Sequence, residues 1–155
     1  MTTKRISAVA LVLSLAGCGS GPEQPEAART VETTRDATST ARSMDEYKMD
    51  LANRVAQVNS IKVFIGRPQP LLRSVVVVKY VVDAEGKLLR SEILRSNRDR
   101  VTENTALSTL RAAAPFPKPP PFLVRHGHVE LIETWLFNND GRFQLRTIAE
   151  PQMNE

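Results

Sequence analysis

Histidines, carboxylates and serines are spread along this 155-residue chain, but their spacing does not assemble a catalytic or metal site. His126 and His128 flank Gly127, and no second pair of ligands accompanies them at zinc-site spacing. Glu130 and Glu133 fall on opposite faces of a strand, so they do not converge for acid–base chemistry. The serines lack a nucleophile-elbow context, and no glycine loop could cradle a phosphate. We therefore expect no catalytic residue, no bound metal and no enzyme.

Covalent chemistry is predicted at one position, Cys18, which is the only cysteine. Two basic residues and an apolar run over residues 6–15 precede it, as in an export signal. The run is shorter than the roughly 20 residues that cross a bilayer. Leu15-Ala16-Gly17-Cys18 resembles the lipobox of bacterial lipoproteins. This resemblance implies removal of residues 1–17 as a signal peptide, lipid on the sulfur and an acyl group such as palmitate on the new amino terminus. The alternatives are a cleaved signal with an incidental cysteine, or a short buried helix.

Residues 18–43 are expected to form the lipidated start of the chain and a flexible tether. Val31 is the only large aliphatic residue after Cys18 in this stretch, which therefore cannot offset its ordering entropy by burial. Removing residues 1–17 takes away two of the 21 basic side chains and none of the 17 acidic ones. The remaining excess is small and no dense basic block is present, which argues against a nucleic-acid partner. The folded domain is predicted over residues 44–149, with a tail at 150–155.

Two amphipathic helices are expected in the folded part. The first starts near Ser43 or Asp45, and the second starts at Asp99 and ends before Pro115. The apolar positions at helical spacing are Tyr47, Leu51, Val55 and Val58 in the first helix, and Val101, Leu107, Leu110 and Ala114 in the second.

Two β-hairpins complete the predicted fold. The first joins residues 74–82 to 88–95 through a turn that ends at Gly86, and the second joins 128–137 to 142–148 through a turn that ends at Gly141. Trp135, Phe137 and Phe143 are expected in the core. The order helix, hairpin, helix, proline-rich crossover, hairpin predicts a small α+β domain, with an antiparallel sheet of two hairpins packed on one face by helices.

Three consecutive segments of this pattern resemble the C-terminal domains of the TonB/TolA family. They are the strand and turn at residues 75–87, the helix that ends Leu110-Arg111-Ala112-Ala113-Ala114, and the return Pro115-Phe116-Pro117-Lys118-Pro119-Pro120. The resemblance covers roughly residues 45–149 and implies a periplasmic domain that binds other envelope proteins. In TonB relatives, a peptide from an outer-membrane transporter adds to an edge strand of this domain. This chain departs from the family by having a lipobox in place of an uncleaved transmembrane helix, and by its short tether.

The expected function is that of a lipid-anchored, periplasm-facing binding module that recognises envelope proteins by edge-strand addition. The candidate edge is the last strand, with Arg142, Gln144 and Arg146, although these could also be plain solvated positions. Gly19 after Cys18 favours the outer membrane by the enterobacterial convention. The alternative is a TonB-type energy transducer for outer-membrane transport that acts through a partner. A homodimer through an edge strand, the identity of the partner and the choice between the two membranes stay open.

Replacing the lipid-bearing sulfur is expected to release the protein from the membrane. Cys18→Ser should move the chain to the soluble fraction, because each buried acyl methylene contributes about 0.8 kcal/mol to anchoring. Fractionation of inner and outer membranes, with the unchanged chain as the control, measures this. Retention of the variant in the membrane fraction would contradict lipidation at Cys18.

Overall fold

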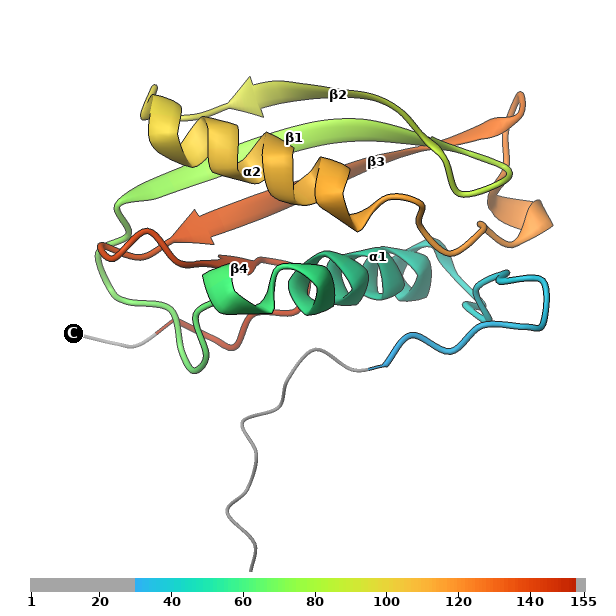
Figure 1. Ribbon diagram of the computed structural model, residues 1–155, viewed down its shortest axis with the longest axis horizontal. Helices are drawn as coiled ribbons and strands as arrows, with labels where there is room; N and C mark the ends of the chain where they lie inside the picture. The colour runs from blue at the N-terminus through green and yellow to red at the C-terminus, as the bar shows by residue number, and fades with distance from the viewer. Residues whose placement is uncertain (1–29, 153–155) are drawn as a thin grey trace, which may run out of the picture.

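The structure is a computed structural model that describes residues 30–152. Its helices and strands are α1 (Met44–Val58), β1 (Ser74–Asp83), β2 (Leu88–Arg95), α2 (Arg100–Ala113), β3 (His128–Phe137) and β4 (Phe143–Leu145), with 3₁₀ turns at Ser60–Lys62 and Pro121–Leu123. The strands form one antiparallel sheet in the order β2-β1-β3-β4, and both helices pack on the same face of it (Figure 1). The predicted α+β fold is confirmed. Cys18, the signal peptide, residues 18–29 and residues 153–155 lie outside the described residues.

The centre of the sheet is the pairing of β1 with β3. Its register runs without interruption from the pair Ser74 and Phe137 to the pair Asp83 and His128. Alternate residues of both strands are buried under the helices, as the period-two pattern predicted. The pairing of β1 with β2 is less regular, with register shifts between Val77 and Val78 and between Val81 and Val82. These shifts place a β-bulge near each end of β2.

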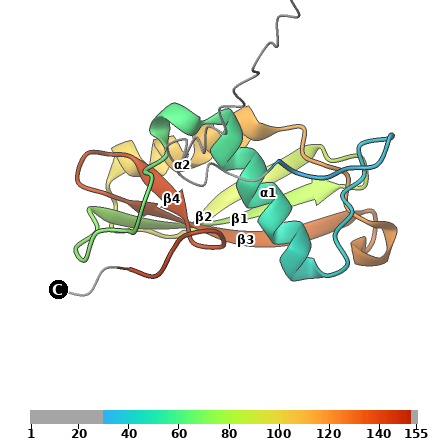
Figure 2. The same ribbon diagram turned by 90° about the horizontal axis from the view of Figure 1, so that it is seen from below.

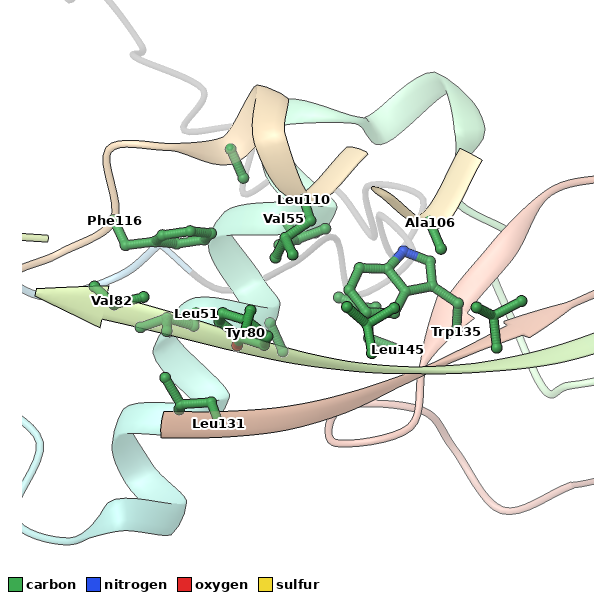
Figure 3. Packing of buried hydrophobic residues seen from close by; sticks show 14 of the residues in the cluster. Leu51, Val55, Tyr80, Val82, Ala106, Leu110, Phe116, Leu131, Trp135 and Leu145 are labelled. Atoms are coloured by element: carbon green, nitrogen blue, oxygen red, sulfur yellow. The ribbon is translucent and has the colours of Figure 1, made fainter. Parts of the chain in front are cut away.

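Trp135 on β3 is fully buried and lies beside Ala106 of α2 and Leu145 of β4 (Figure 3). Its indole Nε1 donates a hydrogen bond to Thr109 Oγ1 at 3.1 Å, and its ring lies 6.4 Å from that of Phe143. Asn59, which follows α1, donates through Nδ2 to the Thr109 carbonyl oxygen at 3.0 Å. The predicted core position of Trp135 is confirmed, and through Thr109 this side chain connects the sheet with both helices.

The buried face of α2 contains Leu110, as predicted, with Leu107 and Ala114 packed against the core, but it does not contain Val101. Val101 is 63% exposed, and the side chains that face the sheet are smaller or more polar than expected. They are Thr102, Ala106, Thr109, Leu110 and Ala113. Small side chains let the helix lie close to the strands, and the threonine hydroxyls are satisfied locally, so burial does not follow the largest apolar residues. Val58 is also exposed, because α1 ends there.

Residues 30–43, predicted as part of the tether, contact the domain. The Ser39 amide donates to the Lys118 carbonyl and the Lys118 amide donates to the Ala37 carbonyl, both at 2.9 Å. Ala41 is buried in the core cluster, and Ser39 Oγ hydrogen-bonds Asp50 on α1. Backbone hydrogen bonds to the proline-rich segment, more than apolar burial, hold this stretch, which composition alone did not indicate.

Gly86 brings the first hairpin against the proline-rich segment. Its φ is +83°, and a Cβ at this position would lie 2.1 Å from the Phe116 carbonyl oxygen. The Phe116 amide donates to the Gly86 carbonyl at 2.8 Å, and the Phe116 ring packs on Tyr80. Glycine is therefore required here both for its backbone conformation and for the close approach.

Alanine at Gly86 is expected to cost more stability than alanine at Gly127. Both glycines have a positive φ, but nothing lies within 4 Å of a Cβ at Gly127. Gly127→Ala should therefore lose only the conformational strain of about 1–2 kcal/mol. Gly86→Ala adds a steric clash of about 1–3 kcal/mol. Urea unfolding of both variants measures the difference, and equal losses would contradict this reading of the turn.

Removing the acceptor of the Trp135 indole is expected to destabilise the domain. Thr109→Val keeps the side-chain shape but leaves the buried N–H without its partner, at a cost of about 1–3 kcal/mol. Thr105→Val on the same helix is the matched control. Its hydroxyl donates to the Val101 carbonyl on the exposed side, so the change should stay within about 0.5 kcal/mol. Urea unfolding compares the two, and an equal effect would exclude a structural role for the indole hydrogen bond.

Candidate functional site

The last strand does not offer the free edge that the sequence predicted. The sequence predicted a last strand over residues 142–148, but β4 spans only Phe143–Leu145. Residues 63–66, here called the strap, lie along its outer side. Val63 bridges to Phe143 in parallel, and the Phe64 amide donates to the Phe143 carbonyl at 2.8 Å. The strap already uses backbone positions that an added peptide would need.

Two of the three predicted partner-binding side chains are engaged within the domain. Gln144 donates through Nε2 to the carbonyls of Phe64, at 3.0 Å, and of Gly66. Arg142 forms an ion pair with Asp140 at 2.7 Å, and its guanidinium lies 5.1 Å from the centre of the Phe64 ring. Arg146 is exposed, and its amide donates to the Thr134 carbonyl at 2.9 Å. The structure brings Arg142 and Gln144 to the strap and leaves Arg146 apart from them.

An unpaired edge lies instead on β3, between its two ends. The backbone of Thr134 bonds Arg146 and that of Asn138 bonds Arg142, so even-numbered residues direct their backbone groups away from β1. The backbone groups of Glu130 and Ile132 therefore point the same way. Among the described residues, no strand pairs with β3 on this side before Trp135. We call residues 129–133 the open edge of β3.

Both ends of the open edge are closed by hydrogen bonds. At the start, the backbone groups of Arg125 and His128 bond each other at 2.9 and 3.1 Å. At the other end, Glu133 Oε1 accepts from the amides of Thr134, at 2.7 Å, and Thr147, at 3.4 Å. The open edge is thus a bounded stretch of about 17 Å, as expected for five strand residues.

The two carboxylates of the open edge lie in opposite environments, which confirms that they fall on opposite faces. Glu130 is on the uncovered face, 3.2 Å from Lys79 Nζ and 3.1 Å from Arg90, and the hydrogen bond from Lys79 lowers its pKa. Glu133 lies under the helices and is 6% exposed. Burial raises the pKa of Glu133, against the opposing effect of its hydrogen bonds. Because the two side chains point to opposite faces of the sheet, their carboxylates do not converge for joint acid–base chemistry.

The opposite edge of the sheet is less suited to accept a strand. No strand of the described part of the chain pairs with the outer side of β2, but the two bulges interrupt the pairing of β2 with β1. Its exposed charged side chains are Arg90, Glu92 and Arg95. Bulges and charges are the features by which proteins protect edge strands from pairing. The open edge of β3 is therefore the more regular of the two.

A metal centre and a membrane-spanning helix are both missing from the part of the chain that the structure describes. Over residues 30–152, no cluster of three or more His, Cys, Asp and Glu side chains could hold a metal ion. No helix in the same range is long and apolar enough to cross a bilayer. His126 adopts a positive φ in the turn before β3, and His128 begins that strand.

A sheet of this kind, with two helices on one face and a bounded open edge, is consistent with a TonB C-terminal-like fold. The chain is 31% identical over 65 residues to a protein described as "Protein TonB" from Pseudomonas putida. The matched region covers 42% of this chain and 27% of that protein. This similarity supports a TonB-like C-terminal domain in this chain. No protein-family model matches the chain, and no solved structure gives a significant match.

Sequence reasoning missed the open edge because it assigned a full-length last strand. The signal available was weak: Thr147 is polar at the position where the alternation of Phe143 and Leu145 calls for an apolar residue. A shorter β4 would have been inferred from that break.

Neutralising Glu133 is expected to flatten the dependence of stability on pH. Because its pKa is raised in the folded state, the unfolded chain loses this proton first as pH rises, and stability falls above the ordinary pKa of 4.5. Glu133→Gln keeps an oxygen acceptor for both amides and should remove this fall. Urea unfolding between pH values of about 4 and 8 measures it.

Glu130→Gln is the matched control for the sign of this effect. The lowered pKa of Glu130 contributes stability that is present at neutral pH and is lost as pH falls through the folded-state value. Its neutralisation should therefore lower stability at neutral pH and flatten the profile on the acid side, while the slope above pH 4.5 stays as in the unchanged chain. A Glu133→Gln profile parallel to that of the unchanged chain would contradict the raised pKa.

Proposed function

We propose that this chain is a lipid-anchored, non-catalytic binding module of the bacterial cell envelope, which recognises partner proteins by adding an extended peptide to the open edge of β3. The observation that carries the proposal is the run of outward backbone groups at Glu130 and Ile132, beside which residues 30–152 place no strand. Envelope proteins are the proposed partners, with outer-membrane transporters among them. The open edge replaces the last strand as the candidate contact surface.

The chemistry of the open edge fits β-augmentation. Backbone amides and carbonyls of Glu130 and Ile132 would bond the added strand, which gives affinity without sequence preference. Selectivity would come from neighbouring side chains on the uncovered face. There, Ile132 is 49% exposed and offers an apolar contact, while Glu130 is neutralised by Lys79 and Arg90. A partner segment with an aliphatic residue opposite Ile132 fits this surface best.

The proposed location is the outer membrane, with the domain facing the periplasm. It rests on the lipobox at Cys18 and on Gly19 after it. A second candidate is a TonB-type energy transducer that acts through a partner, which the similarity to the TonB protein favours. The two candidates share the open edge and differ in whether a motor drives the bound partner. A homodimer through an edge strand would occupy the same surface.

Proline at Ile132 is expected to abolish partner capture without unfolding the domain. It removes one outward amide, and proline is tolerated on strand edges. In a pull-down from envelope extract, the unchanged chain should capture a partner that Ile132→Pro does not. Circular dichroism of the variant checks that the fold is kept.

Ser91→Pro tests the other edge in the same assay. Ser91 is opposite Tyr80, whose backbone groups face β3, so the Ser91 amide points outward from β2. This variant should capture the partner as the unchanged chain does. Loss of capture with Ser91→Pro and not with Ile132→Pro would move the binding edge to β2.

A further inference from the structure

The four most exposed large apolar side chains of the described residues gather at one end of the domain. They are Ile61 (88%), Leu71 (75%), Val101 (63%) and Ile65 (55%). Three lie on the loop between α1 and β1, and the fourth lies on the first turn of α2. Both Figure 1 and Figure 2 place this loop at the same end as the start of α2 and the β3–β4 turn. An ion pair of 2.8 Å between Arg73 and Asp99 joins the loop to α2.

This end also carries the net positive charge of the described residues. We call residues 61–73, 95–103 and 138–142 the basic end. It has seven basic and three acidic side chains, whereas the other described residues have eleven basic and eleven acidic ones. Two of its acidic residues, Asp99 and Asp140, are neutralised by arginines. Lys62, Arg98 and Arg100 are exposed and form no ion pair within residues 30–152.

Beyond the proposed partner binding, we propose that the basic end docks on the surface of an anionic phospholipid bilayer. Single aliphatic side chains on a loop, such as Ile61, Ile65 and Leu71, can enter the headgroup region of a membrane one at a time. Lysine and arginine beside them attract the phosphate groups of an anionic membrane, and this attraction acts within about one Debye length of the surface. The apolar side chains are interleaved with charges, so they suit a charged, deformable lipid surface better than a matched protein pocket.

Vesicle flotation of the chain from residue 19 onward tests the proposal. The shortened chain holds every described residue and lacks Cys18, so a lipid anchor cannot contribute. Purified protein and vesicles alone are mixed, so a protein partner cannot contribute either. It should float with vesicles of phosphatidylglycerol and phosphatidylethanolamine and not with vesicles of phosphatidylcholine alone. Binding should weaken as salt rises from about 0.05 to 0.5 M, because screening shortens the reach of the charges.

Paired variants separate the two contributions. Arg98→Gln with Arg100→Gln should weaken binding about 25-fold, at about fivefold for each charge near the surface. Arg35→Gln with Lys87→Gln removes equal charge from the opposite end and should change it less than twofold. Ile65→Ser with Leu71→Ser should also weaken binding, whereas Phe122→Ser, about as exposed as Ile65 but outside the basic end, should not.

Three results would overturn the proposal. The first is no flotation with anionic vesicles, and the second is equal flotation with both vesicle types. The third is self-association in analytical ultracentrifugation that Leu71→Ser abolishes, which would assign this end to a contact between copies of the chain. Since the assay contains no partner, its failure leaves edge-strand binding untouched. Loss of pull-down by Ile132→Pro is likewise independent of lipid.

Discussion

The hydrogen bond between the Trp135 indole and the Thr109 hydroxyl is the interaction on which the rest of the structure depends. Trp135 is fully buried between β3, α2 and the Phe143 ring of β4. The Thr109 carbonyl oxygen also accepts a hydrogen bond from Asn59, which follows α1. The same residue therefore connects α2 with α1. A domain this small buries a limited share of its surface, so one large side chain with a satisfied polar group contributes a substantial part of its stability.

Placing both helices on one face determines which surfaces remain free. The helices cover alternate residues of β1 and β3, and the other face and the sheet edges stay outside the core (Figure 2). β4 is too short to cover β3, because the chain leaves the sheet after Leu145 and the amide of Thr147 bonds Glu133 instead of continuing the ladder. Had β4 continued to residue 148, as its sequence suggested, the backbone of Ile132 would have been paired. The open edge of β3 is thus a consequence of where β4 ends.

Local signals predicted the fold well, and contacts between distant segments explain where prediction failed. The alternation in β1, the glycines that end both hairpin turns and the Asp99 cap each act within a few residues, and all are confirmed. The predicted stripe of α2 is confirmed at Leu110 and was wrong at Val101, because close approach to the sheet selects Ala106 and Ala113 over Val101. The length of β4 depends on its contact with the strap. The conformation of residues 30–43 depends on hydrogen bonds to the backbone of Lys118. No periodicity within those segments encodes either contact.

The two proposed surfaces, the open edge of β3 and the basic end, are compatible because they lie toward opposite ends of β3. The basic end contains the turn that follows β3, whereas the open edge begins near His128, at the opposite end of that strand. A bilayer beneath the basic end would therefore leave the far half of β3 directed away from the lipid. In that orientation a peptide can approach Glu130 and Ile132 without competing with phosphate groups. Contact with the membrane would also fix the direction of the edge, so that less rotational freedom is lost when a partner binds.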